Sequence, residues 1–291
     1  MIGRIFNQKV RWICGGVTVV VAVVVVLFYA PMGAWAERML ELFRIKQVSV
    51  VAVDMEGLEG QAERLVRLLA DDVMITREPE KRIEVTSIEQ ARELAGFHVR
   101  SFGERASVAR MWIQSGIACQ MTINVSKVED VLAELGRADI QLPASLKSAT
   151  VAIDVPKSVI ARYELDSSAD PWDGSFMFYQ SPTPTVVIPQ ELNLSEIAAA
   201  GLQLAGWSAE QARAFSQTID WTSTLVVPIP ARVTSHETVD VDGVKGTLIT
   251  ESRSGQRPSK FLLLWVRQGI IYALAGYGEP AEALSLAEML E

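Results

Sequence analysis

One segment constrains this chain more than any other: residues 12–36 contain no charged side chain. As a helix, a run of this length exceeds the roughly 30 Å hydrocarbon core of a bilayer. Residues 1–11 carry Arg4, Lys9 and Arg11 and no acidic residue, which favours a cytoplasmic N-terminus by the positive-inside bias. We therefore predict a short cytoplasmic tail over 1–11 and a single transmembrane helix over 12–36 that contacts the lipid bilayer. The remaining chain then lies outside the cytoplasmic membrane.

A cleavable signal peptide is the alternative interpretation of the same segment. The basic start, the Val-rich stretch 13–28, Pro31 and the small residues up to Ala36 match that pattern, and cleavage after Ala36 would release a secreted protein. The membrane anchor is favoured because the apolar run is long for a signal and because 37–46 continues as an amphipathic segment. Both interpretations place residues 37–291 in the same compartment.

Charge and cysteine content exclude several classes of function. A net charge of −8 and an isoelectric point near 5.0, with no basic stripe beyond residue 12, argue against a nucleic-acid partner. Cys14 lies in the apolar run and Cys119 in a strand-like stretch, so we expect no intramolecular disulfide. With Cys14 in the apolar run, only one Cys and two His remain, too few for a four-ligand Cys/His zinc site. We predict no metal and no cofactor.

Periodicity predicts an α+β fold with antiparallel sheets and helices packed on one face of the sheet. The apolar runs are interrupted by Gly and Pro at 115–116, 155–156 and 182–184, and we expect a pair of short strands around each interruption. Strands joined mostly by hairpin-type turns are the expected organisation. We divide the extracytoplasmic part into a region 37–175 and a region 176–291 packed together. Helices are expected over 58–72, 87–96, 128–136, 195–207, 208–219 and 279–290.

Local signals fix several element ends. Ser87 with Gln90, and Ser208 with Gln211, have the spacing of a capping box at a helix N-terminus. Gly96 is expected to end the first of these helices. The dipeptide 242–243, Asp-Gly between valines, predicts a two-residue hairpin turn.

Catalytic constellations are weak. Ser235, His236 and Asp240 are close in sequence, but neighbouring strand residues point to opposite faces, so Ser235 and His236 cannot cooperate in a triad. The aspartates between 166 and 173 lie in a Ser/Pro/Gly-rich stretch typical of turns, without the ligand order of a calcium loop. We predict that the chain is not an enzyme.

Aromatic side chains are the better candidates for binding. They can line a groove for a lipid or a peptide, or they can fill the core between a sheet and its helices. The stretch 176–189 is the preferred groove, since its prolines would expose an edge strand that a partner could extend. The candidate groove residues are Phe176, Phe178, Tyr179, Trp221 and Trp265.

The C-terminal half resembles a bacterial domain family of unknown function (DUF4367-like) found beyond the single membrane span of anti-sigma-factor-type proteins. The most specific part is "VDGVKG", "LLLWVRQGIIYALAGYG" and "EALSLAEML" within residues 239–291, and the block 37–54 is also similar. The resemblance implies an extracytoplasmic sensory or regulatory domain, loosely akin to lipoprotein-carrier and sigma-regulator domains with a curved half-barrel sheet. It implies no catalytic residues.

The chain departs from that family at its N-terminus. Residues 1–11 contain no His or Cys and are too short for the cytoplasmic module with which anti-sigma factors grip a sigma factor. The expected function is therefore a membrane-anchored sensory or regulatory domain without catalytic activity, whose partner is an envelope protein or lipid. The alternative is a secreted or anchored carrier whose half-barrel holds a lipid or a lipoprotein anchor, which requires an apolar cavity.

Overall fold

The computed structural model describes residues 45–53, 73–146, 149–165, 175–189, 191–230, 234–251 and 259–291. The predicted transmembrane helix, the alternative cleavage site and the helix expected over 58–72 lie outside these residues. Within the described ranges, no helix is both long and apolar enough to cross a membrane. The described chain is a mixed α/β fold whose sheets are mostly antiparallel, in agreement with the coarse prediction.

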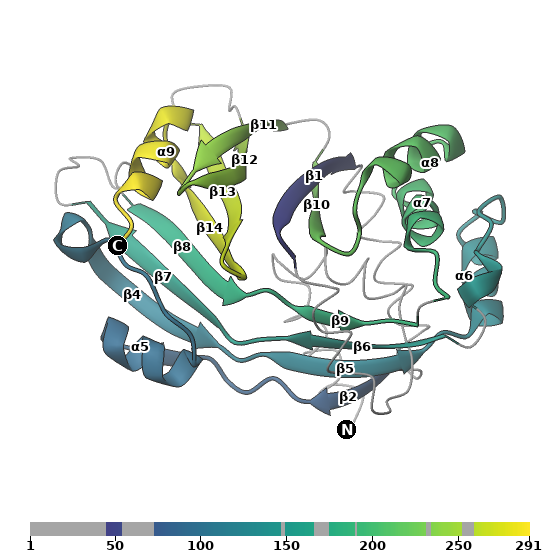
Figure 1. The fold of residues 1–291 in the computed structure, drawn as a ribbon, viewed down its shortest axis with the longest axis horizontal. Helices are drawn as coiled ribbons and strands as arrows, with labels where there is room; N and C mark the ends of the chain where they lie inside the picture. Colours follow the sequence, from purple (N-terminus) through teal and green to yellow (C-terminus); the bar gives the residue numbers. More distant parts are fainter. Residues whose placement is uncertain are drawn as a thin grey trace.

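Short helices are interspersed between runs of strands along the described chain (Figure 1). The strands are β1 Gln47–Val53, β2 Val73–Arg77, β3 Ile83–Val85, β4 Ser107–Gln114, β5 Ile117–Thr122, β6 Thr150–Val155, β7 Ser158–Glu164, β8 Ser175–Pro182, β9 Thr185–Val187, β10 Thr224–Pro230, β11 Thr234–Val241, β12 Val244–Glu251, β13 Lys260–Arg267 and β14 Ile270–Tyr277. The α-helices are α5 Ile88–Ala95, α6 Val125–Glu134, α7 Leu194–Leu204, α8 Ala209–Thr218 and α9 Pro280–Glu288.

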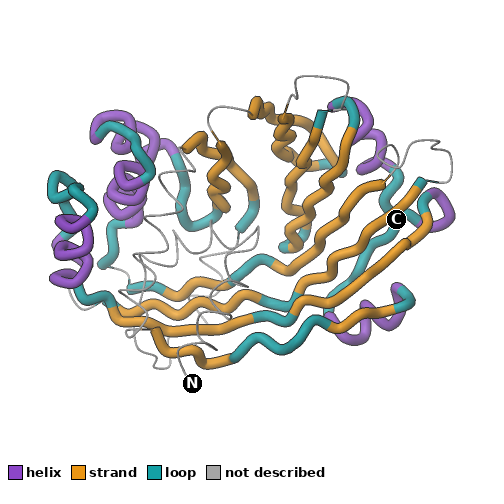
Figure 2. Tube along the Cα trace, turned by 180° about the vertical axis from the view of Figure 1, so that it is seen from behind, coloured by secondary structure: helices purple, strands orange, loops and turns teal. Residues whose placement is uncertain are grey.

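Two antiparallel sheets are end-to-end continuations of each other. An eight-stranded sheet has the order β11-β12-β13-β14-β8-β7-β4-β3, and a four-stranded sheet has the order β2-β5-β6-β9. Each strand of the second sheet is preceded or followed in the chain by its counterpart in the first: β2 with β3, β4 with β5, β6 with β7, and β8 with β9. Figure 2 shows these as long strands that sweep across the molecule with short interruptions near their middles.

The pairing register proves that the interruptions are kinks rather than turns. Gln114 pairs with Ser158 before the interruption and Ile117 with Val155 after it, so both strands advance by the same number of residues. The pairing of β7 with β8 likewise continues without insertion into that of β6 with β9. The expectation of a pair of strands around each interruption is confirmed, whereas the general expectation of hairpin-type turns between strands does not hold at 115–116, 155–156 and 182–184. A Gly or Pro that interrupts a ladder bends a strand as readily as it reverses one.

One face of the eight-stranded sheet carries the largest core, covered by α5 and α9. Gly96 ends α5 in the left-handed region at φ 78°, as predicted. Of the predicted capping box only one half forms: Ser87 accepts a hydrogen bond from the Gln90 backbone N–H, whereas the Gln90 side chain accepts from the Thr86 N–H. Pro280 stands in the first turn of α9. Phe102 lies at the centre of the core, in edge-to-face contact with Tyr163, and burial raises the pKa of Tyr163 to about 12.

The four-stranded sheet has its own core, which α6 and α7 cover. Val128 and Val131 of α6 and Ile197 of α7 pack on Met121 and Val151 of the sheet. Asn193 caps α7 by accepting a hydrogen bond from the Glu196 N–H, and the predicted capping box of Ser208 and Gln211 opens α8. In Figure 1, α6, α7 and α8 gather at the end of the long strands opposite α5 and α9.

A parallel two-stranded ribbon, β1 with β10, lies between the two halves (Figure 1). Val50 of β1 and Ile229 of β10 face the eight-stranded sheet, whereas Val51 and Val226 face α7 and α8. Alternate residues thus bury both faces of the ribbon, which explains its largely apolar sequence. The expectation of antiparallel pairing throughout is wrong here, because two apolar runs far apart in the chain pair without any local turn signal.

The hairpin turns of the eight-stranded sheet follow the sequence closely. Asp242 and Gly243 both have positive φ, 52° and 75°, as the turn that matches strand twist requires. Gln268 and Gly269 form the same kind of turn between β13 and β14. The first of these turns is the one predicted from the Asp-Gly dipeptide at 242–243.

A buried ion cluster attaches the C-terminal end to the sheet. The carboxylate of Asp242 accepts hydrogen bonds from the guanidinium groups of Arg100 and Arg267, and from Trp265 Nε1 at 3.3 Å. The side chains of Asp242 and Arg100 are 7% and 14% exposed. Arg100 also donates to the Leu290 carbonyl at 3.1 Å, and the Glu291 N–H donates to Ser101 at 2.9 Å. The turn, the loop before β4 and the end of α9 are therefore held by one group of charges.

Candidate functional site

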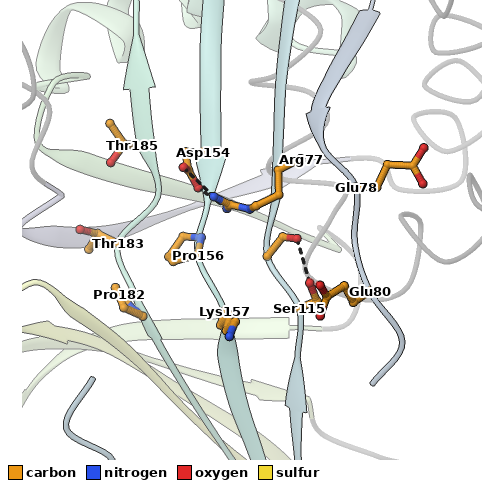
Figure 3. Close-up of a pocket in the computed structure, with 11 residues that line it drawn as sticks. Arg77, Glu78, Glu80, Ser115, Asp154, Pro156, Lys157, Pro182, Thr183 and Thr185 are labelled. Atoms are coloured by element: carbon orange, nitrogen blue, oxygen red, sulfur yellow. Dashed lines mark hydrogen bonds and ion pairs between the residues drawn. The ribbon is translucent and has the colours of Figure 1, made fainter. Parts of the chain in front are cut away.

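The four kinks lie at the same level of the long strands and together enclose an open hollow of about 490 Å³. This volume is in the range of small-molecule sites. We call it the bend hollow; Figure 3 shows its lining. The lining residues are Arg77, Glu78, Glu80, Ser115, Gly116, Asp154, Pro156, Lys157, Pro182, Thr183 and Thr185.

A row of paired residues crosses the hollow on one face of the four-stranded sheet. Arg77, Ala118, Asp154 and Thr185 are successive partners across β2, β5, β6 and β9. The guanidinium of Arg77 reaches over the intervening strand and binds Asp154 through two hydrogen bonds of 2.5 and 3.0 Å (Figure 3). It also donates to the Val155 carbonyl at 3.0 Å. The bond to Asp154 raises the pKa of Arg77.

Gly116 permits this crossing. A Cβ atom at this position would lie 2.3 Å from the Val155 carbonyl oxygen and 3.0 Å from the Arg77 Nη2 atom. Glycine therefore allows the kinked backbones of β4–β5 and β6–β7 to approach each other while the arginine passes above them.

We predict that Gly116→Ala lowers the free energy of unfolding by about 1–3 kcal/mol, because the methyl group overlaps backbone atoms that cannot move freely. Chemical denaturation followed by circular dichroism measures this cost. The control is Ser115→Ala, which leaves the backbone approach intact and should change stability by less than about 0.5 kcal/mol. Equal stability of Gly116→Ala and the unmodified chain would show that the strands can separate at the kink.

Two contacts join the hollow to the eight-stranded half. The Lys157 ammonium donates to the Leu94 carbonyl at 2.9 Å, in the last turn of α5, where a cation is favoured by the helix dipole. The Thr183 N–H donates to the Gly269 carbonyl at 2.9 Å, at the tip of the β13–β14 hairpin. The hollow thus lies at a junction whose walls belong to both halves of the bent sheet.

The lining of the hollow is charged and polar. It presents both signs of charge and three hydroxyl groups, from Ser115, Thr183 and Thr185, to a ligand. Its lining contains no His or Cys, and no nucleophile in it is paired with a base. In the described part of the chain, no cluster of His, Cys, Asp and Glu has the composition to hold a metal ion.

The five predicted groove residues do not come together on one surface. Phe178 and Trp265 are 0% exposed and Phe176 is 3% exposed, all in the core beneath α5 and α9. Tyr179 is half-buried on the opposite face of β8, and burial raises its pKa. Trp221 packs with α8, where its Nε1 donates to the Ser216 carbonyl at 2.7 Å. This arrangement matches the second interpretation of these aromatics, in which they fill the core.

The structure also shows where the weaker candidates for catalysis lie. Ser235 bonds the Thr250 hydroxyl at 2.7 Å, His236 is exposed, and Asp240 binds Lys245 at 2.7 Å on the neighbouring strand. The aspartates between 166 and 173 lie outside the described residues. The residues of the bend hollow were not singled out from the sequence, although the Gly and Pro residues of three of the kinks, at 115–116, 155–156 and 182–184, were recognised separately.

Comparisons of this chain with protein-family models, with curated proteins and with solved structures find no match.

Proposed function

We propose that this chain is a membrane-anchored, extracytoplasmic sensory domain without catalytic activity, which binds a small polar ligand in the bend hollow. The observation that carries the proposal is the charged row Arg77–Asp154 across an open hollow formed where four strands kink together. The anchor over 12–36 and the extracytoplasmic location come from the sequence pattern.

The lining supports a zwitterionic ligand such as a short peptide. The Lys157 ammonium donates one hydrogen bond to the Leu94 carbonyl, and its other N–H groups can donate to a ligand carboxylate. The carboxyl group of Glu80 lies beside Ser115, across the hollow from Thr183, and suits an ammonium group (Figure 3). The hydroxyls of Thr183 and Thr185 can bind the amide groups between them.

The position of the hollow supports a sensory role. A ligand that touches the Asp154 side and the Lys157 side together contacts both halves of the bent sheet. If the ligand binds more tightly at one bend angle of the sheet than at another, binding shifts the population toward the angle with the higher affinity. The size of this shift is set by the difference between the two binding free energies. The carrier alternative is less well supported, since a hollow lined by charged and hydroxyl side chains offers an acyl chain little apolar surface.

The test is thermal unfolding of the full chain in detergent micelles, with trialanine as the peptide probe and palmitate as the acyl probe. At a hundredfold excess over Kd, trialanine should add about 2.7 kcal/mol and raise Tm. Asp154→Ala should abolish this rise; it removes a half-exposed ion pair and so costs less than about 1 kcal/mol of stability.

The matched control is Glu84→Ala, which breaks the exposed pair between Glu84 and Arg110 on β3 and β4, away from the hollow. This variant should keep the full response to trialanine. No response of the unmodified chain to trialanine, or an equal response of Asp154→Ala, would overturn the proposal. A response to palmitate alone would replace it with the carrier.

A further inference from the structure

The two antiparallel sheets end in four edge strands, and three of these are short or distorted. β3 and β9 are three residues long each, and β2 has a register shift between Ile75 and Arg77 and is followed by Pro79. Short strands, bulges, prolines and charges are the features by which proteins keep an edge from pairing with another chain.

Of these features β11 has only charges, at Glu237 and Asp240, and it is neither short nor bulged nor interrupted by proline. It is eight residues long, contains no proline, and pairs with β12 in unbroken register from Thr234 to Val241. The side chains of residues 235–238 are exposed, and the strand lies at the outer edge of its sheet (Figure 1). Among the described residues, the backbone of β11 makes no hydrogen bond except with β12. The outward N–H and C=O groups therefore form a template for another strand.

We propose that β11 pairs with β11 of a second copy of this chain, antiparallel, with Thr238 on the two-fold axis. Directly opposed residues in an antiparallel pair lie on the same face of the sheet, which limits the allowed registers. With Thr238 opposite itself, His236 of each copy faces Asp240 of the other, and this favourable pair occurs twice. A register centred on Glu237 would place two carboxylates directly opposite each other, which is destabilising.

The neighbouring strand supports this register. Lys245 of β12 already binds Asp240 at 2.7 Å, so the dimer would form a row of Lys245, Asp240 and the second copy's His236 across three strands. An isologous interface of this kind closes as a dimer and leaves no unpaired β11 edge. The two eight-stranded sheets would then become one continuous sheet.

The register is tested by oxidative cross-linking of the full chain in detergent. Thr238→Cys brings two thiols onto the axis, where opposed Cα atoms are about 4.5–5.5 Å apart, within the range of a disulfide. It should give about tenfold more covalent dimer than Ser107→Cys, which lies on an interior strand. The unmodified chain shows how much cross-linking the native cysteines produce by themselves. Detection of two peptides joined by a disulfide between their residues 238 would support the proposal. Dominant cross-linking of Val239→Cys instead would overturn the register.

The dimer itself is tested by sedimentation velocity. Thr238→Lys places two ammonium groups face to face and should convert the dimer to monomer, whereas Thr122→Lys, on a strand of the other sheet, should leave it unchanged. Circular dichroism establishes that both variants fold. A monomeric unmodified chain, or a Thr238→Lys variant that still dimerises, would overturn the proposal.

Discussion

Replacing Trp265 with alanine is expected to lower the free energy of unfolding by about 3–5 kcal/mol. The side chain is 0% exposed and stacks on Tyr272 with ring centroids 5.2 Å apart. Its other stacking partner, Phe178, lies 6.2 Å away, and its Nε1 donates to Asp242. Truncation leaves a large cavity between the sheet and α9, and it also removes one hydrogen bond from a buried carboxylate.

Denaturant unfolding followed by circular dichroism measures this loss. Trp265→Phe keeps an aromatic ring and loses only the N–H and part of the volume, so it should cost clearly less than the alanine variant. Trp112→Ala, at a half-buried tryptophan on the opposite face of the sheet, provides the matched control and should cost less still. A Trp265→Ala variant of unchanged stability would instead favour the groove interpretation of this residue.

Asp242→Asn is the second substitution expected to have a large effect, a loss of about 3 kcal/mol. The carboxylate is shared as counter-ion by two guanidinium groups, and the side chain of Arg100 is 14% exposed. Removing the charge leaves these cations partly buried without a counter-ion, which costs more than the intact cluster contributes. Asparagine tolerates the positive φ of 52° at this position, so the turn itself is retained.

The comparison that isolates this effect is Asp240→Asn, two residues earlier in the same chain segment. Its partner Lys245 and Asp240 itself are 68% and 81% exposed, so the pair is screened by solvent and its loss should cost less than about 1 kcal/mol. Both variants are measured by denaturant unfolding at low and at high salt. Equal costs for the two substitutions would mean that the Asp242 cluster contributes no more than a surface pair.

Local signals predicted the elements whose ends depend on one or two neighbouring residues. Ser87 and Ser208 cap helices through backbone N–H groups three residues further on, and Asp242-Gly243 forms the expected turn. In each case the interacting atoms are close in sequence, so the residue types alone limit the local conformation.

The candidate site could not be predicted from such local signals. Gly116 and Pro156 indicated interrupted strands, but a glycine or proline does not specify whether the chain reverses or continues after it. Here the non-local pairing of Gln114 with Ser158 and of Ile117 with Val155 holds both strands in one direction. Only this pairing brings Arg77 and Asp154, far apart in the chain, to 2.5 Å across the hollow.

The sequence by itself was enough to identify the uncharged run at 12–36 and to predict the class of fold, the helix caps and the tight hairpins. These features depend on composition or on atoms a few residues apart. The tertiary structure alone decided that the interrupted strands are kinked, that β1 and β10 pair in parallel, and that Phe178 and Trp265 fill a core. These outcomes depend on which distant segments share hydrogen bonds and apolar surface. No local pattern of residues encodes that choice.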